Sequence, residues 1–166
     1  MTDILFKTDT FLFSYRVAGV LIRDGKVLLQ KMPGEPGYAF PGGHAGLGEI
    51  NPDTLKREFL EEINTDISVG DLLWVGEIFF PWDGRSCHQI CLFYQVSLST
   101  EAGIPLDGWF PTVDHLAGRE IPLEFHWVPL AALDRILLYP PQAKQQALLK
   151  SGGSLRHFIF HEEVDK

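Results

Sequence analysis

The segment at residues 51–64 constrains the fold most, because it is the clearest amphipathic helix in the sequence. Its apolar residues recur at every fourth position and form one stripe: Leu55, Phe59 and Ile63. Asn51 is a suitable N-cap, and Pro52 fits the first helical position, where its missing N–H costs nothing. Asn64 lies where helices commonly end through a left-handed residue. We therefore expect one central helix whose apolar stripe packs inward.

Strand-forming residues lie on both sides of this helix. Residues 15–31 predict a hairpin, since Asp24-Gly25 favours a type I′ turn, which needs positive φ at both central positions. A second strand pair and its connecting loop are expected at 72–80, 90–98 and 81–85. Strands before and after one central helix indicate an α+β or α/β protein.

The last third of the sequence is less regular. Residues 99–122 carry three prolines and are expected to be mostly loop. The other expected elements are a short strand, two helices and a final strand: 125–128, 130–138, 142–149 and 157–160. A length of 166 residues favours a single domain over residues 1–166.

The charge balance excludes some partners. Lys plus Arg is 14 and Asp plus Glu is 22, which gives a net charge of −8 and argues against bulk electrostatic binding to nucleic acid. No run approaches the roughly 18–20 apolar residues that cross a bilayer, and residues 1–7 do not resemble a signal peptide. We therefore expect a cytoplasmic protein without nucleic acid or membrane partners. Cys87 and Cys91 are expected to be reduced thiols.

Three carboxylates gather on the helix, on a face largely opposite its apolar stripe. Glu58 lies three and four positions before Glu61 and Glu62, so the three side chains share one face. Like charges at this spacing destabilise a helix, and a hard divalent cation with oxygen ligands would offset the repulsion. The alternative from helix composition alone is a solvated acidic face with an Arg57–Glu61 ion pair.

The residues before the helix favour the metal interpretation. Pro41-Gly42-Gly43 allows the backbone to approach a ligand or metal closely, and Glu49 adds a fourth carboxylate. From Gly43, five residues lead to Glu49, and seven more lead to Arg57-Glu58-Phe59-Leu60-Glu61-Glu62. This spacing over residues 43–65 resembles the box of Nudix hydrolases, of the MutT-like and ADP-ribose pyrophosphatase-like kind.

The resemblance extends more weakly over roughly residues 15–138 and departs from the box at two positions. Asn64 stands where the pattern has Gly, and Thr65 stands where it has an apolar residue. Neither position bears a metal ligand, and Asn adopts the left-handed conformation at modest cost. We therefore expect the loop geometry of the box to survive.

The resemblance implies a fold and a reaction. The implied fold is an α+β, α/β/α sandwich with a mixed sheet between helices and a loop-helix-loop metal site. The implied reaction is hydrolysis of a diphosphate linked to another group, usually in a nucleoside diphosphate derivative such as ADP-ribose or in a nucleoside triphosphate, with Mg²⁺ or Mn²⁺. Bound metals of this kind neutralise diphosphate oxygens and orient the attacking water.

The resemblance also assigns roles within the box. Glu58 and Glu62 are the surest metal ligands, Glu61 is a ligand or the base that activates water, and the Gly42 carbonyl is a further ligand. The implied supporting residues hold the carboxylates and the loop in place: Arg57, Glu49 and Gly43.

Many members use one more acid from a late loop. Glu120, seven residues before Trp127, is the first candidate for this metal ligand, and Asp114 and Glu124 are its competitors. The sequence leaves the choice open.

Residues for substrate binding are less defined. Phe80 and Trp82 are candidates for stacking on a base, and Arg16, Lys31 and Tyr38 are candidates for contact with phosphate or ribose. Pro81 lies sixteen residues beyond Thr65, where ADP-ribose pyrophosphatases of this family tend to carry a proline.

Two other functions stay open at this point. The departures at residues 64 and 65 suggest a nucleotide-binding or sensing module without catalysis. The apolar and aromatic run at residues 79–82 suggests a hydrolase of a non-nucleotide diphosphate. A homodimer also stays open, because dimers are common among related folds.

Overall fold

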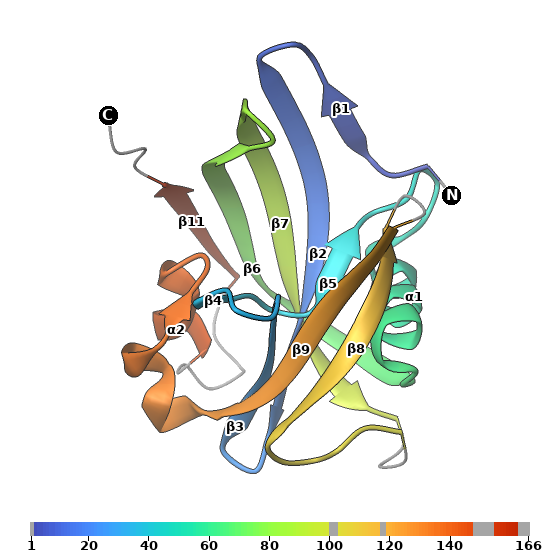
Figure 1. Ribbon diagram of the computed structural model, residues 1–166, viewed down its shortest axis with the longest axis vertical. Helices are drawn as coiled ribbons and strands as arrows, with labels where there is room; N and C mark the ends of the chain where they lie inside the picture. Colours follow the sequence, from blue (N-terminus) through green and yellow to red (C-terminus); the bar gives the residue numbers. More distant parts are fainter. Residues whose placement is uncertain (1, 100–102, 117–118, 148–154, 163–166) are drawn as a thin grey trace.

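The computed structural model describes residues 2–99, 103–116, 119–147 and 155–162 (Figure 1). The strands are β1 (Leu5–Lys7), β2 (Phe11–Arg23), β3 (Lys26–Lys31), β4 (Gly37–Tyr38), β5 (Gly42–His44), β6 (Ile67–Trp82), β7 (Arg85–Leu98), β8 (Trp109–Leu116), β9 (Arg119–Pro129), β10 (Leu137–Leu138) and β11 (Arg156–His161). The helices are α1 (Asn51–Ile63), the 3₁₀ helix η1 (Leu130–Arg135) and α2 (Gln142–Ala147).

The strands form one large mixed sheet in the order β11-β6-β7-β2-β3-β9-β8, with β1 and β5 also paired to β2. The pairs β2–β7 and β11–β6 are parallel, whereas the hairpins β2–β3, β6–β7 and β8–β9 are antiparallel. Strand β2 pairs with β7 over residues 11–21 but with β3 only at its last two residues. Strands β3, β9 and β8 therefore diverge from the rest of the sheet, as Figure 1 shows.

Two hydrophobic cores lie on opposite faces of the sheet. One contains the apolar stripe of α1, packed between β2 and β7 on one side and β8 and β9 on the other. The second contains Leu133 and Ala143 of η1 and α2, packed on Ala18 and Phe93. A mixed sheet with helices on both sides confirms the α+β sandwich expected from the sequence.

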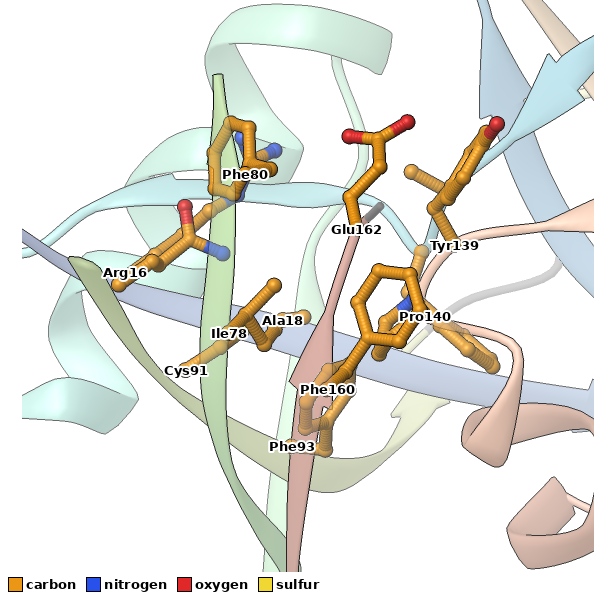
Figure 2. A pocket seen from close by; sticks show the side chains of 13 residues that line it. Arg16, Ala18, Ile78, Phe80, Cys91, Phe93, Tyr139, Pro140, Phe160 and Glu162 are labelled. Atoms are coloured by element: carbon orange, nitrogen blue, oxygen red, sulfur yellow. The ribbon is translucent and has the colours of Figure 1, made fainter. Parts of the chain in front are cut away.

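Beside the second core lies an apolar pocket of about 160 Å³. Figure 2 shows that its walls come from β2, β6, β7, β11 and the segment after β10. A groove of about 340 Å³ runs from Arg16 along β3 and β4. Arg16 borders both hollows.

The first expected hairpin is confirmed. Asp24 and Gly25 have φ values of 48° and 73°, as the turn requires. The second strand pair is also present, but its strands extend through residues 81 and 82 because Asp83 and Gly84, at φ 52° and 71°, form the turn alone. The expected loop at 81–85 is therefore too long.

The expectation of a loop over 99–122 is wrong for the residues that form β8 and β9. Pro111 lies in β8, an edge strand, where a missing N–H is tolerated. Pro122 lies in β9 before the part that pairs with β3, which begins at Glu124. Both prolines thus occupy positions that demand no second ladder hydrogen bond.

The ends of the central helix match the expectation in part. The N-cap is Ile50, so the assignment of Asn51 as N-cap is wrong. Asn51 instead accepts a hydrogen bond from Tyr15 (2.8 Å) and donates one to Tyr94 (3.0 Å). Asn64 does end the helix in the left-handed conformation, with φ 49° and ψ 45°.

The remaining expectations have mixed outcomes. The helix expected at 130–138 is instead the short 3₁₀ helix η1 followed by β10. The helix expected at 142–149 is present as α2 over residues 142–147, and residues 148 and 149 lie outside the described residues. The final strand is confirmed as β11. Cys87 and Cys91 are buried free thiols. Within the described ranges, no helix is long and apolar enough to cross a membrane.

Candidate active site

The glycine segment at residues 42–43 lies directly against helix α1. Gly42 has φ 144°, and a Cβ at this position would collide with the Val17 carbonyl. A Cβ at Gly43 would overlap the carboxylate of Glu58. Both glycines are therefore needed for the close approach of β5 to β2 and to the acidic face of α1.

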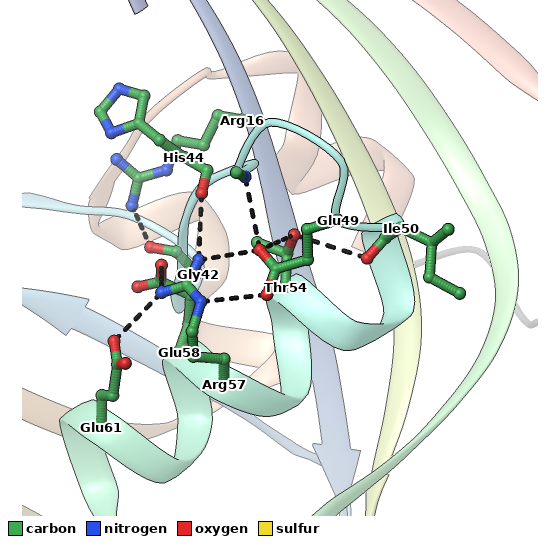
Figure 3. A network of polar contacts seen from close by, with 10 residues as sticks. Arg16, Gly42, His44, Glu49, Ile50, Thr54, Arg57, Glu58 and Glu61 are labelled. Atoms are coloured by element: carbon green, nitrogen blue, oxygen red, sulfur yellow. Dashed lines mark hydrogen bonds and ion pairs between the residues drawn. The ribbon is translucent and has the colours of Figure 1, made fainter. Parts of the chain in front are cut away.

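Arg57 is the centre of a polar network that ties the acids together (Figure 3). Its Nε donates to Glu49 Oε1 (3.1 Å), and its Nη1 donates to Glu58 Oε1 (2.6 Å) and Glu61 Oε2 (3.1 Å). Its Nη2 donates to the carbonyl of His44 (3.3 Å). Burial disfavours the Arg57 cation, but the bonds to Glu49 and the charge of Glu58 outweigh it and raise its pKa.

Glu49 connects this network to the start of the helix. It accepts hydrogen bonds from Thr54 Oγ1 (2.7 Å) and from the Gly46 N–H (3.3 Å), besides those from Arg57. The hydrogen bonds from Arg57 hold the pKa of Glu49 below its ordinary value. Glu49 is therefore an ionised anchor between the glycine segment and α1.

Glu62 is the most unusual acid of the helix. Only 6% of the residue is exposed, and its Oε2 has no hydrogen-bond partner among the described residues. Burial, together with the charge of Glu58, raises the pKa of Glu62 to about 8. Burial also raises the pKa of Glu58, against the opposing charge of Arg57. A carboxylate oxygen without a partner in this position fits a cation.

The acids around Glu62 differ in accessibility. The side chain of Glu61 is 57% exposed, whereas that of Glu58 is 14% exposed. Among the described residues, no three His, Cys, Asp or Glu side chains converge closely enough to hold a metal ion. One Arg57 nitrogen, Nη1, donates to both Glu58 and Glu61. The donor set of hard carboxylate oxygens nevertheless suits Mg²⁺ or Mn²⁺ chemically.

Arg16 links the acids to the two hollows. Its Nη2 donates to the Gly42 carbonyl (2.6 Å). Its positive charge partly opposes the rise that burial causes in the pKa of Glu58 and of Glu62. A carbonyl oxygen has a second lone pair, so this bond leaves the Gly42 carbonyl able to accept another partner. Arg16 therefore lies between the acids of α1 and the two hollows.

The register of β8 and β9 separates the three candidates for the late acid. Asp114 lies opposite Ile121, which packs on the core around α1, and directly opposed residues share a face of the sheet. Glu120 and Glu124 alternate with Ile121, so their side chains lie on the other face. Glu124 bonds to His126 there at 3.1 Å.

The negative charge of Asp114 contributes to the raised pKa of Glu62. The geometry favours Asp114, and the choice of Glu120 as first candidate is not supported by its position.

The candidates for substrate binding separate into three places. Phe80 lines the apolar pocket, whereas Lys31 and Tyr38 line the groove, where the Lys31 ammonium lies 5.4 Å from the centre of the Tyr38 ring. Trp82 lines neither hollow and stacks instead on His44, with ring centroids 5.9 Å apart. The structure thus groups four of the five candidates around the two hollows.

Several residues near the site were not indicated by the sequence. His44 follows the glycine segment, and burial lowers its pKa, while its Nε2 has no hydrogen-bond partner in the part of the chain that the structure describes. Gln89, Tyr139 and Glu162 line the apolar pocket. The position of His44 inside the box could have drawn attention to it, whereas the other three are brought together only by the tertiary fold.

Comparison with known proteins gives the family. The model of the NUDIX domain matches residues 14–149. The chain therefore belongs to the NUDIX domain family. A search of curated proteins gives no match.

Solved structures give the same fold. An ADP-ribose pyrophosphatase from Streptococcus suis has 14% identity and a TM-score of 0.58, over 87% of this chain and 98% of that one. A mutator MutT protein from Bacillus halodurans has 16% identity and a TM-score of 0.56, over 89% and 90%. A UDP-X diphosphatase has 15% identity and a TM-score of 0.56, over 91% and 68%. At these identities the likeness establishes the fold alone.

Proposed function

We propose that the protein hydrolyses the diphosphate bond of a nucleoside diphosphate derivative, with Mg²⁺ or Mn²⁺ held by Glu58, Glu62, Glu61 and the Gly42 carbonyl. The observation that carries this proposal is the buried Glu62 oxygen without a partner, beside Glu58 and the glycine segment. Asp114 completes the donor set in place of Glu120, because its side chain shares the face of α1.

The side chains divide the work by position. When bound, a divalent cation would neutralise diphosphate oxygens and lower the pKa of water. Arg57 holds Glu58, Glu61 and Glu49 in fixed orientations through its hydrogen bonds. Glu61 is exposed enough to accept the proton of an attacking water. Arg16 supplies a fixed positive charge for a phosphate, since it already contacts the Gly42 carbonyl.

The same proposal covers the whole chain as one domain. Strand β1 pairs with β2, and β11 pairs with β6, so the strands outside residues 14–149 belong to the same sheet. The alternative of a silent binding module draws no support from residue 64, because Asn64 already adopts the left-handed conformation.

A hydrolysis screen with Mg²⁺ tests the proposal. ADP-ribose, other nucleoside diphosphate derivatives, nucleoside triphosphates and non-nucleotide diphosphates are compared for the wild type and for Glu62→Gln. Asp53→Asn is the matched control, because Asp53 is an exposed acid on the first turn of the same helix. We expect turnover of a nucleotide class that is lost in Glu62→Gln and kept in the control. Equal turnover by Glu62→Gln and wild type would refute the role of Glu62, and faster turnover of compounds without a base would favour the non-nucleotide alternative.

A further inference from the structure

A row of aromatic rings crosses five neighbouring strands of the large sheet. Each ring is the register partner of the next, and adjacent ring centroids lie 4.4 to 6.3 Å apart. Directly opposed residues of paired strands share a face of the sheet, so all the rings lie on one face. The row consists of Phe6 of β1, Phe13 of β2, His88 of β7, Phe79 of β6 and His161 of β11.

Helix α1 packs on this same face, but farther along the strands. In β2 its contacts are with the core residues Val17 and Leu21, which follow Phe13 toward the other end of the strand. In Figure 1 the β1–β2 and β6–β7 turns lie at the top of the sheet, above α1. Phe6 is accordingly 60% exposed, and Phe11, which shares its face with Phe13, is 62% exposed. The end of the face that carries the row is therefore open to solvent.

The rows on either side of the rings are also poor in charge. One neighbouring row is Phe11, Ser86 and Pro81, and the other is Tyr15, Ile90, Glu77 and Ile159. The Glu77 carboxylate of this second row already bonds to His157 Nε2 (2.8 Å), and Ile159 is 53% exposed. A sheet face directed at water is ordinarily polar. These three rows, which we call the ring face, instead resemble the apolar inner face of a sandwich.

The size of the ring face suits a small interface between proteins. One residue of a sheet face occupies about 30 Å², so the three rows cover roughly 400 Å² in projection. Their accessible area is larger, because the exposed side chains of Phe6, Phe11 and Ile159 protrude from the sheet. Stable interfaces begin at about 600 Å² per partner. Burial of the whole ring face approaches this lower limit, which corresponds to a weak, reversible complex.

The row of rings also complements a second copy of itself. Sheets pack face to face about 10 Å apart. A two-fold axis parallel to β7 and above His88, the middle ring, brings Phe13 opposite Phe79 of the second copy and Phe6 opposite its His161. Every ring of the row then meets a ring, as the self-complementary interface of a symmetric dimer requires. Glu77 keeps its own partner in this arrangement, so the contact buries no unpaired carboxylate.

We propose that the ring face is the interface of a homodimer, in which two copies of the chain pack row on row about this axis. Sedimentation equilibrium between about 1 and 200 µM tests the inference on the wild type, Phe6→Ser and the control Trp109→Ser. Trp109, of the edge strand β8, is 57% exposed and lies outside the ring face. We expect the wild type to dimerise within this range. Phe6→Ser should raise the dissociation constant at least tenfold, because symmetry removes the ring twice, and Trp109→Ser should leave it unchanged.

Cross-linking tests the orientation of the two copies. Phe6→Cys and His161→Cys are treated with a short bismaleimide, separately and mixed; the native Cys87 and Cys91 are buried, and the wild type is the blank. The mixture should form linked dimers that neither variant forms alone. A wild type that stays monomeric at 200 µM, equal dissociation constants for wild type and Phe6→Ser, or equal linking in the mixed and separate samples would overturn the inference. None of these residues belongs to the proposed metal site, so the result is independent of the proposed hydrolysis.

Discussion

The metal-free protein should carry a stability cost that grows with pH and originates at Glu62. An unfolded glutamate has a pKa of 4.5, whereas burial and the charge of Glu58 raise that of Glu62 to about 8. The folded state therefore holds a proton that the unfolded state releases, so stability falls as the pH rises from about 4.5 to 8. At pH 7 the difference amounts to about 3 kcal/mol, since each pKa unit corresponds to about 1.4 kcal/mol.

Replacement of this carboxyl by an amide should remove the cost. In urea unfolding with a chelator, we expect Glu62→Gln to gain about 2–3 kcal/mol over wild type between pH 5 and pH 7. Asp53→Asn, which replaces an exposed acid on the same helix, should follow the wild type at both values. Mg²⁺ should stabilise the wild type at pH 7 and leave Glu62→Gln nearly unchanged, because a ligand stabilises the state that binds it. Parallel pH profiles of wild type and Glu62→Gln would refute the reasoning.

Three further predictions concern the site and its supports. Gly43→Ala should reduce turnover strongly while the protein still folds, because the added Cβ displaces the Glu58 carboxylate; activity and circular dichroism of the same sample separate the two effects, and normal turnover would contradict the argument. Phe59→Ala should cost about 3–5 kcal/mol in urea unfolding, since Phe59 is fully buried between the two parts of the sheet, and a loss below 1 kcal/mol would contradict it. Asn64→Gly should leave stability within about 1 kcal/mol and turnover unchanged, because both residues tolerate φ 49°; a large loss of either would show that the Asn64 side chain has a role that its backbone conformation does not explain.

The central helix and its acids could be predicted because their signals are local. The spacing of Leu55, Phe59 and Ile63 and the end at Asn64 depend only on neighbours within a few turns. The burial of Glu62 could not be predicted in this way. Helix composition alone left an acidic face in solvent open as the alternative to a metal site. In the structure, β8 packs beside α1 and brings the charge of Asp114 toward Glu62.

The apolar pocket shows the limit of local reasoning more clearly. Glu162 reaches the site because β11 pairs with β6 in parallel, and Tyr139 reaches it because β10 pairs with β4. Parallel pairing has no turn signal in the sequence, since the partners are joined by long connections. The prolines of residues 99–122 led to the wrong prediction of a loop for a related reason. A proline is acceptable in a strand wherever no neighbouring strand needs its N–H for a ladder hydrogen bond.

The parallel pairing of β2 with β7 also has a kinetic consequence. Strand β2 carries Arg16 and Ser14, and its partner β7 carries Gln89. Ser14 and Gln89 are register partners and are joined by a hydrogen bond, although they lie 75 positions apart in the chain. Contacts of such long range cost loop entropy before they contribute stability, and they slow the folding of a domain. The helix with the acids can form early from local interactions, whereas the pocket exists only after the two strands have met. Recovery of ligand binding during refolding should therefore lag behind recovery of helical signal, which makes the site a reporter of the last step of assembly.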